Sequence, residues 1–327
     1  MKKKLTVHIG SHKTATTFLQ NSFSINQPIL DQLGILYPKA GRIYGAHHQL
    51  AWSVRKQETQ GEALLSLDHW PAFLAEAVAS PHEQVVISSE DFEWIGNVER
   101  LAALSEWFDV SVVFYLRSSD SYLESYYNQL VKDFGTRETR TLDEYVTESS
   151  LFFLETQVIL NRWAEVFGKE AIRLRLFGKQ HLPDGIEYDF LRTLGLTSKP
   201  VFKPAELSIL QKVSLPPDAL EYLRLCNPYL TRQDGHHDFV IHLVEMAAAN
   251  SDNLQKTRSG ILSLEAKRNV LRRFRLGNRQ AMNLYRGVDR VPFPVDDAKP
   301  HTNYEGRLAV ATTDIMAYVA VLAREVP

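Results

Sequence analysis

The chain has 327 residues, 44% of them hydrophobic and 23% charged, which is the balance of a globular protein with material for a large core. Its formal net charge is −2, so no global basic field indicates a nucleic-acid partner, and any anion must be held by a local site. The single cysteine, Cys226, excludes an internal disulfide bond and fits a reducing cytoplasm.

Two apolar segments bear on where the protein resides. The N-terminal stretch MKKKLTVHIG is basic, but its apolar run of about five residues is shorter than that of a signal peptide. The stretch at 315–323 is shorter than the roughly 20 residues of a membrane span and predicts a buried helix. We therefore expect a cytoplasmic protein with no integral membrane segment.

Strand and helix patterns alternate along the first 196 residues. Short apolar runs predict strands, and apolar residues at helical spacing predict helices. Pro28 should bound the first helix, Pro71 should lie in the first turn of a helix, and Gly168 should end one. The expected strands are 5–9, 34–38, 84–90, 111–117 and 171–177; the expected helices are 15–26, 61–79, 98–108, 119–131, 154–167 and 188–196; 132–145 is expected to be a polar loop.

This alternation predicts a parallel β-sheet with helices on both faces. In such sheets ligands bind at the carboxyl ends of the strands, where this chain carries the polar stretches GSHKT, SSED and RSSD. After about residue 200, helices dominate, and no repeat or linker interrupts the chain. We expect one domain over residues 1–327, with an α/β core at 1–196 and a mainly helical C-terminal part at 197–327.

The stretch HIGSHKTATTFLQ (8–20) joins the first strand to the first helix. A turn of this kind directs free backbone N–H groups and the positive end of the helix at one point. With Lys13 and the hydroxyls of Thr14, Thr16 and Thr17, it predicts a site for a tetrahedral anion. The plainer alternative is that Thr14 only caps the helix and that Lys13 is solvated.

An ATP or GTP P-loop requires G-x-x-x-x-G-K-[ST]. Here His12 stands before the lysine in place of glycine, and Gly10 lies three residues before Lys13, whereas the first glycine of the motif lies six before it. No obvious aspartate for magnesium accompanies the loop. A P-loop nucleotide kinase is weakened by these differences and stays an alternative.

A second pattern lies in LRSSDSYLESYY. Arg117 ends a predicted strand, and Ser125 lies eight residues later in the following helix. A planar guanidinium and a hydroxyl on the inward face of that helix can hold one phosphate together. Taken alone, these residues would better fit an arginine that caps its own sheet and a serine that faces solvent.

Together the two patterns resemble the nucleotide-binding motifs of sulfotransferases. SHKTATT resembles their 5′-phosphosulfate loop, and Arg117 with Ser125 and a following Tyr-Tyr resembles their 3′-phosphate motif, in the same order along the chain. Over about residues 4–196 the chain is similar to this family, in particular to its bacterial branch. The resemblance implies a P-loop-like parallel β-sheet flanked by helices and the donor 3′-phosphoadenosine 5′-phosphosulfate, with no metal ion.

The resemblance also implies roles for individual residues. Arg117 and Ser125 would hold the 3′-phosphate. Phe18 stands where many members place a tryptophan against adenine, and a core phenylalanine is the equal alternative. Lys13, Thr16 and Thr17 would bind the 5′-phosphosulfate through their side chains. Backbone N–H groups from His12 to Thr17, including those of Thr14 and Ala15, would bind it as well. Ala15 stands where the family usually has glycine.

The implied reaction is in-line attack of an acceptor hydroxyl on sulfur, with Lys13 stabilising the charge on the departing phosphate. Glu90, at the end of a predicted strand, is the first candidate for the base that takes the acceptor proton. His48 and His47 are the competitors, and a carboxylate at a helix N-terminus is the plain alternative for Glu90. The partner is an acceptor with a free hydroxyl, such as a sugar or a phenol. A non-catalytic nucleotide-binding protein on the same fold is a further alternative.

Overall fold

The computed structural model describes residues 2–56, 63–208, 214–230, 235–249 and 261–298, so the helix expected at 315–323 lies outside the described residues. The chain divides into two compact units, each built from three segments. The first unit comprises Met1–Ser118, Phe152–Glu206 and Phe274–Pro292, and the second comprises Ser119–Leu151, Leu207–Arg273 and Phe293–Pro327. The units therefore do not follow a single cut of the sequence at residue 196.

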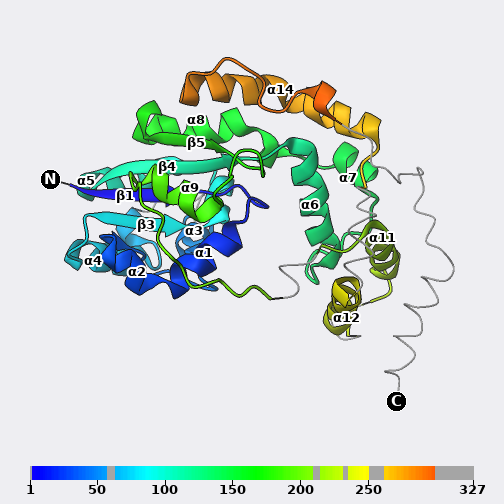
Figure 1. Cartoon of the computed structure of the whole chain (residues 1–327), viewed down its shortest axis with the longest axis horizontal. Coiled ribbons are helices and arrows are strands. Elements are labelled where there is room, and N and C mark those ends of the chain that lie inside the picture. Colours follow the sequence, from blue (N-terminus) through cyan, green and yellow to red (C-terminus); the bar gives the residue numbers. More distant parts are fainter. Residues whose placement is uncertain (1, 57–62, 209–213, 231–234, 250–260, 299–327) are drawn as a thin grey trace. The chain divides into compact units, whose positions relative to one another are not determined.

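The first unit contains a five-stranded parallel sheet. Its strands are β1 (Lys3–His8), β2 (Ile35–Leu36), β3 (Gln84–Ser88), β4 (Phe108–Leu116) and β5 (Ile172–Leu176). Their order is β2-β3-β1-β4-β5, and every pair is parallel. Figure 1 shows β3, β1, β4 and β5 side by side, with α8 along β5. The predicted α/β class, a parallel sheet flanked by helices, is confirmed.

The helices of the first unit follow the strands in the predicted alternation. They are α1 (Thr16–Ile25), α2 (Gln27–Gln32), α3 (His48–Lys56), α4 (Trp70–Ala79), α5 (Leu104–Trp107), α8 (Thr156–Phe167), α9 (Ile186–Thr193) and the part of α14 (Leu264–Arg286) from Phe274 on. Short 3-10 turns occur at η1 (Leu64–Ser66), η2 (Glu90–Trp94), η3 (Val98–Leu101), η4 (Phe152–Leu154) and η5 (Lys169–Ala171).

Alternating side chains of the strands cover two faces of the sheet. On one face, Val113 and Tyr115 of β4 pack in a buried cluster with Phe23 of α1 and Phe190 of α9. The opposite face carries α8, which contacts β4 and β5. Because successive side chains of a strand point to opposite faces, this alternation decides toward which face each residue at the end of a strand points.

Several predicted boundaries change for local reasons. The first helix ends at Ile25, and Pro28 lies in the first turn of α2, where proline loses no helical hydrogen bond. Pro71 in the first turn of α4 and Gly168 (φ 86) after α8 are as predicted. Of the range 61–79 expected to be helical, residues 61 and 62 lie outside the described residues, η1 occupies Leu64–Ser66, and α4 begins at Trp70. The helix expected at 98–108 is wrong, because η3 and α5 occupy that range and Phe108 already starts β4.

The second unit is helical where it is described. It contains α6 (Ser119–Lys132), α7 (Leu142–Glu148), α11 (Pro217–Cys226), α12 (His236–Ala249), the first part of α14 and the turn η7 (Val295–Asp297). The expected polar loop at 132–145 ends early, because Thr141 and Glu144 form a capping box that starts α7. Among the described residues after 197 the ordered elements are helices, as predicted. No helix of the described ranges is long and apolar enough to cross a membrane.

Candidate functional site

The loops after β1 and β4 meet at the carboxyl ends of two adjacent strands. The chain leaves β1 toward β2 on one side of the sheet, whereas it leaves β4 toward β5 on the other side. Connections that part in this way leave a crevice where ligands bind in open α/β sheets. Lys13 lies in the first loop, and Arg117 directly follows β4. The guanidinium of Arg117 donates a hydrogen bond to the Lys13 carbonyl oxygen and lies 5.6 Å from the centre of the Phe177 ring.

The loop between β1 and α1 is held in an unusual backbone conformation. Lys13 (φ 62) and Ala15 (φ 59) are both left-handed, and alternation of this kind forms anion-binding backbone concavities. The Thr14 hydroxyl donates to the Ser11 carbonyl oxygen (2.6 Å), and the N-cap of α1 is Ala15, without a side-chain cap. The alternative that Thr14 caps the helix is therefore wrong. A left-handed φ at position 15 is a conformation that glycine adopts more readily than alanine.

The Lys13 side chain is half-buried, which does not agree with a freely solvated lysine. Burial and then the neighbouring Arg117 guanidinium lower the pKa of Lys13, and Glu90 partly opposes this. Two cations that approach each other in a partly buried place favour the binding of an anion, because the anion relieves their repulsion.

The other predicted loop residues lie in the first turn of α1. Thr16 is buried and Thr17 is half-buried, and the first N–H groups of a helix have no intrahelical partner. Phe18 is half-buried and packs against the cluster around Phe23 and Phe190. Part of the Phe18 ring is thus core, and part remains accessible from outside.

His12 is a structural anchor of the loop. Its main-chain N–H donates to Glu93 Oε1 (3.1 Å), its ring Nδ1 is hydrogen-bonded to the same oxygen, and its ring stacks on Trp94 with centroids 4.1 Å apart. Burial alone would lower the pKa of His12, but the carboxylates of Glu93, Glu90 and Asp91 raise it overall; burial raises the pKa of Glu93. The expectation that the His12 N–H binds the donor needs correction, because Glu93 already accepts from it.

Glu90 lies against the same loop. A Cβ atom on Gly10 (φ +99) would lie 3.0 Å from both Cα and Cβ of Glu90, so glycine is what lets the loop approach this closely. Gln20 donates to Glu90 Oε2 (2.8 Å). Burial alone would raise the pKa of Glu90, but His12, His48 and Gln20 lower it overall. The carboxyl group is therefore an anion at neutral pH, close enough to Lys13 to affect its pKa.

His48 lies beside Glu90 in a polar cluster. Its Nδ1 is 2.8 Å from Ser89 Oγ and 3.2 Å from Asp91 Oδ2, and its ring stacks on Trp52. Asp91 also accepts from Trp52 Nε1 (2.7 Å) and from Arg55 (3.2 Å). Asp91 and Arg55 were missed in the sequence. Asp91 directly follows Glu90 in the stretch SSED, and this adjacency was the feature of the sequence that could have identified it.

The ring of His47 is held by main-chain groups. Its Nε2 is 2.9 Å from the Pro38 carbonyl oxygen, and its Nδ1 accepts from the Ser88 N–H (3.1 Å), so backbone groups occupy both ring nitrogens. Burial lowers the pKa of His47 to about 3. These contacts count against His47 as the base and favour Glu90 and His48 as the candidates.

Ser125 is half-buried on α6 and belongs to the second unit, whereas Arg117 belongs to the first. Their pairing on one phosphate stays a prediction. Within the described residues, no group of three or more His, Cys, Asp or Glu side chains is placed to hold a metal ion.

Comparisons with known proteins find distant similarity. No family model matches the chain. An uncharacterized protein of Archaeoglobus fulgidus is 28% identical over 116 residues, and the chain spans 30% of the length of that relative and matches it over 34% of its own. A crystal structure of a sulfotransferase from Alicyclobacillus acidocaldarius aligns with 69% of this chain and 95% of its own, with a TM-score of 0.43 and 16% identity. Similarity this distant does not assign an activity to the chain.

Proposed function

We propose that this protein is a sulfotransferase that moves a sulfuryl group from 3′-phosphoadenosine 5′-phosphosulfate to an acceptor hydroxyl. The observation that supports the proposal is the contact of Arg117 with the Lys13 loop where the connections of β1 and β4 part. Two cations converge there on a left-handed loop, and the Glu90 carboxylate lies close by. This combination suits an anionic donor beside a group that accepts a proton.

In this proposal the loop holds the 5′-phosphosulfate. Lys13 contributes its ammonium, and Thr16 and Thr17 contribute hydroxyls and the free N–H groups of the first helical turn. Arg117 holds the 3′-phosphate, and we assign Ser125 to the same phosphate. Phe18, with its accessible part, is assigned to the adenine. The single-domain organisation over residues 1–327 is part of the same proposal.

The residues divide the work of transfer between them. The acceptor oxygen forms a bond to sulfur while the bond from sulfur to the phosphate oxygen breaks, and adenosine 3′,5′-bisphosphate leaves. Lys13 stabilises the charge that grows on the departing oxygen. Glu90 takes the proton of the acceptor hydroxyl, and His48, oriented by Ser89 and Asp91, is the competing base. The acceptor is a molecule with a free hydroxyl, such as a sugar or a phenol, and the single cysteine supports a cytoplasmic location.

The decisive experiment measures release of adenosine 3′,5′-bisphosphate from the donor across a panel of sugar and phenol acceptors. Thermal unfolding with the bisphosphate at about 100 times its dissociation constant should show roughly 2.7 kcal/mol of added stability. ATP with Mg²⁺ is the control for the kinase alternative and should add little. Tight bisphosphate binding without transfer to any acceptor would favour a non-catalytic nucleotide-binding protein, and absence of bisphosphate binding would reject the proposal.

A further inference from the structure

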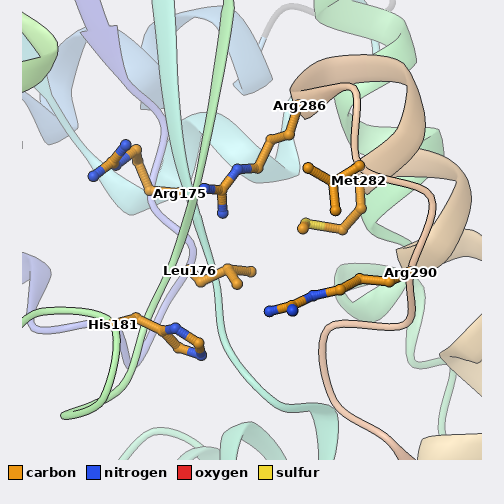
Figure 2. Close-up of a pocket in the computed structure, with 7 residues that line it drawn as sticks. Arg175, Leu176, His181, Met282, Arg286 and Arg290 are labelled. Carbon is orange, nitrogen blue, oxygen red and sulfur yellow. The ribbon is translucent and has the colours of Figure 1, made fainter.

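A second basic site lies within the first unit, at the end of β5. It is a cavity of about 280 Å³ between β5 and the last turn of α14 with the loop that follows. Leu176 and Met282, both buried, form an apolar wall together with Val288. The polar lining comes from Arg286, Arg290 and His181, whose side chains extend toward Leu176 from different sides in Figure 2.

The protein balances the charge of this cavity only in part, through the action of Asp189 on Arg286. Arg175 also borders it, but its guanidinium turns away (Figure 2) and is neutralised by hydrogen bonds to Asp189. In the described part of the chain, neither Arg286 nor Arg290 makes a side-chain hydrogen bond or an ion pair. Burial, followed by Arg175 and Arg290, lowers the pKa of Arg286. Burial, followed by the two arginines 286 and 290, lowers the pKa of His181, so its ring is neutral at neutral pH.

The elements that carry the two arginines are fixed in place. Gly287 (φ 66) ends α14 in the left-handed conformation and turns the chain back. Asp289 in this loop accepts two hydrogen bonds of 2.7 Å from Arg279. The Tyr285 hydroxyl donates to Asn161 of α8 (2.7 Å). A cation at a helix C-terminus, such as Arg286, is common, but Arg290 lies outside the helix, so the helix dipole does not account for both.

The cavity is separate from the Lys13 loop. Phe177, which contacts the Arg117 guanidinium, packs with the cluster on the α1 and α9 face. Arg175 points to Asp189 of α9 on that same face. Because side chains alternate along a strand, Leu176 points to the other face, toward Met282. The pocket therefore opens on the α14 side of β5, away from the face that carries Arg117.

We propose that this cavity binds a phosphate or sulfate monoester. Two guanidinium groups that form no ion pair within the described residues match a dianion, and planar guanidinium groups suit the oxygens of these anions. The neutral His181 ring adds a hydrogen-bonding nitrogen, and the apolar wall accommodates the organic part of the ester. The site is distinct from the donor site assigned above and does not depend on the proposed sulfuryl transfer.

The test is calorimetric titration with inorganic phosphate and with phenyl phosphate, at constant ionic strength, in the Lys13→Ala variant, which lacks the loop cation. Phosphate should bind, and phenyl phosphate should bind more tightly because of the apolar wall. Arg286→Gln and Arg290→Gln should each weaken binding about 10-fold or more, as expected for a charge-assisted hydrogen bond. Arg192→Gln is the matched control, because this exposed arginine occupies the last turn of α9 as Arg286 occupies that of α14.

Three outcomes would overturn the inference. Unchanged phosphate affinity in Arg286→Gln and Arg290→Gln, in variants whose thermal unfolding shows that they fold, would mean that the cavity is not the site. An equal loss of phosphate affinity in Arg192→Gln would mean that phosphate responds to the overall surface charge and not to this cavity. A loss of adenosine 3′,5′-bisphosphate affinity in Arg290→Gln in otherwise wild-type protein, as large as the loss in Lys13→Ala, would make the cavity part of the donor site. Failure of sulfuryl transfer alone leaves the expected phosphate binding unchanged, so the two proposals fail separately.

Discussion

The guanidinium of Arg117 donates a hydrogen bond to the main-chain carbonyl oxygen of Lys13, although the two residues are 104 positions apart in the chain. The contact joins the loop after β1 to the end of β4 and brings two cations to one place. The Phe177 ring, directly after β5, lies against the guanidinium. Arg117 thus has two effects, since it stabilises the form of the loop through the carbonyl and lowers the pKa of Lys13 through its charge.

Replacing Lys13 with alanine should separate activity from stability. Loss of one contact that acts in the transition state lowers turnover by about 10²–10³. Stability should stay the same or rise, because burial and Arg117 disfavour the Lys13 charge in the folded state. Bisphosphate release and thermal unfolding measure the two quantities. Lys39→Ala, at an exposed lysine, is the control. Near-normal turnover in Lys13→Ala would remove the proposed role.

Arg117→Ala and Ser125→Ala should weaken binding of adenosine 3′,5′-bisphosphate but hardly change binding of adenosine 5′-phosphate. Each charge-assisted hydrogen bond to the 3′-phosphate is worth about 1.5–3 kcal/mol, and calorimetry with both nucleotides measures the difference. Because Arg117 also holds the Lys13 loop, Ser125→Ala is the cleaner variant. Ser121→Ala, half-buried on the same helix, is its matched control. Equal losses for both nucleotides would show that these residues do not recognise the 3′-phosphate.

The strands were predictable because continuous apolar runs with polar ends are typical of the buried strands of a parallel sheet. The range 98–108 was not. Val98, Leu101 and Leu104 are buried and lie three residues apart, a spacing that an α-helix and a 3-10 turn both satisfy. The structure satisfies this spacing with η3, which contacts α8, followed by a short α5, which contacts β4.

The meeting of the Lys13 loop with Arg117 was predictable, because the carboxyl ends of parallel strands lie at one edge of the sheet. Lys13 and Arg117 follow neighbouring parallel strands, so their proximity follows from the strand order. His47 and His48 could not be separated, because adjacent residues of one type carry the same local signal. The difference comes from distant backbone groups, the Pro38 carbonyl and the Ser88 N–H, which occupy the His47 ring. The Glu93 partner of the His12 N–H is likewise a tertiary contact.

The pair His12 and Glu93 should make stability depend on pH in a defined window. The raised pKa of His12 means that the folded state binds this proton more tightly than the unfolded state. The contribution is complete below the ordinary histidine pKa of about 6.5 and is lost as pH rises through the raised value. The raised pKa of Glu93 also makes the free energy of unfolding fall as pH rises, starting from the ordinary glutamate pKa of 4.5. Urea unfolding from pH 6.5 upward should therefore show a falling free energy of unfolding.

His8 and His47 do not obscure this window. Burial lowers their pKa values to about 4 and about 3, so they change the free energy of unfolding only below the ordinary histidine pKa of about 6.5. We therefore assign the fall in the free energy of unfolding just above that pH to His12 and Glu93. Glu93→Gln removes the principal carboxylate and should flatten the decline, whereas Glu165→Gln, at an exposed carboxylate of α8, should leave it as in the wild type. An equally steep decline in Glu93→Gln would contradict the assignment.

The final prediction concerns the base. Glu90→Gln should keep bisphosphate binding and lower turnover by about 10²–10⁴, because glutamine retains the shape and a hydrogen-bonding oxygen for Gln20 but cannot take a proton. The lowered pKa of Glu90 keeps the carboxylate ionised down to below its ordinary value of 4.5, so this group should cause no loss of rate between pH 8 and 5.5. Steady-state rates with a saturating donor measure both effects.

Two histidine variants complete the comparison. His48→Ala should cost less turnover than Glu90→Gln, because in this assignment His48 stabilises the Glu90 and Asp91 anions and takes no proton from the acceptor. His47→Ala should lower the free energy of unfolding by about 1–3 kcal/mol, since it leaves the Pro38 carbonyl and the Ser88 N–H without their partner. An inactive His48→Ala that still binds the bisphosphate, beside an active Glu90→Gln, would transfer the role of base to His48 and leave the sulfotransferase proposal standing.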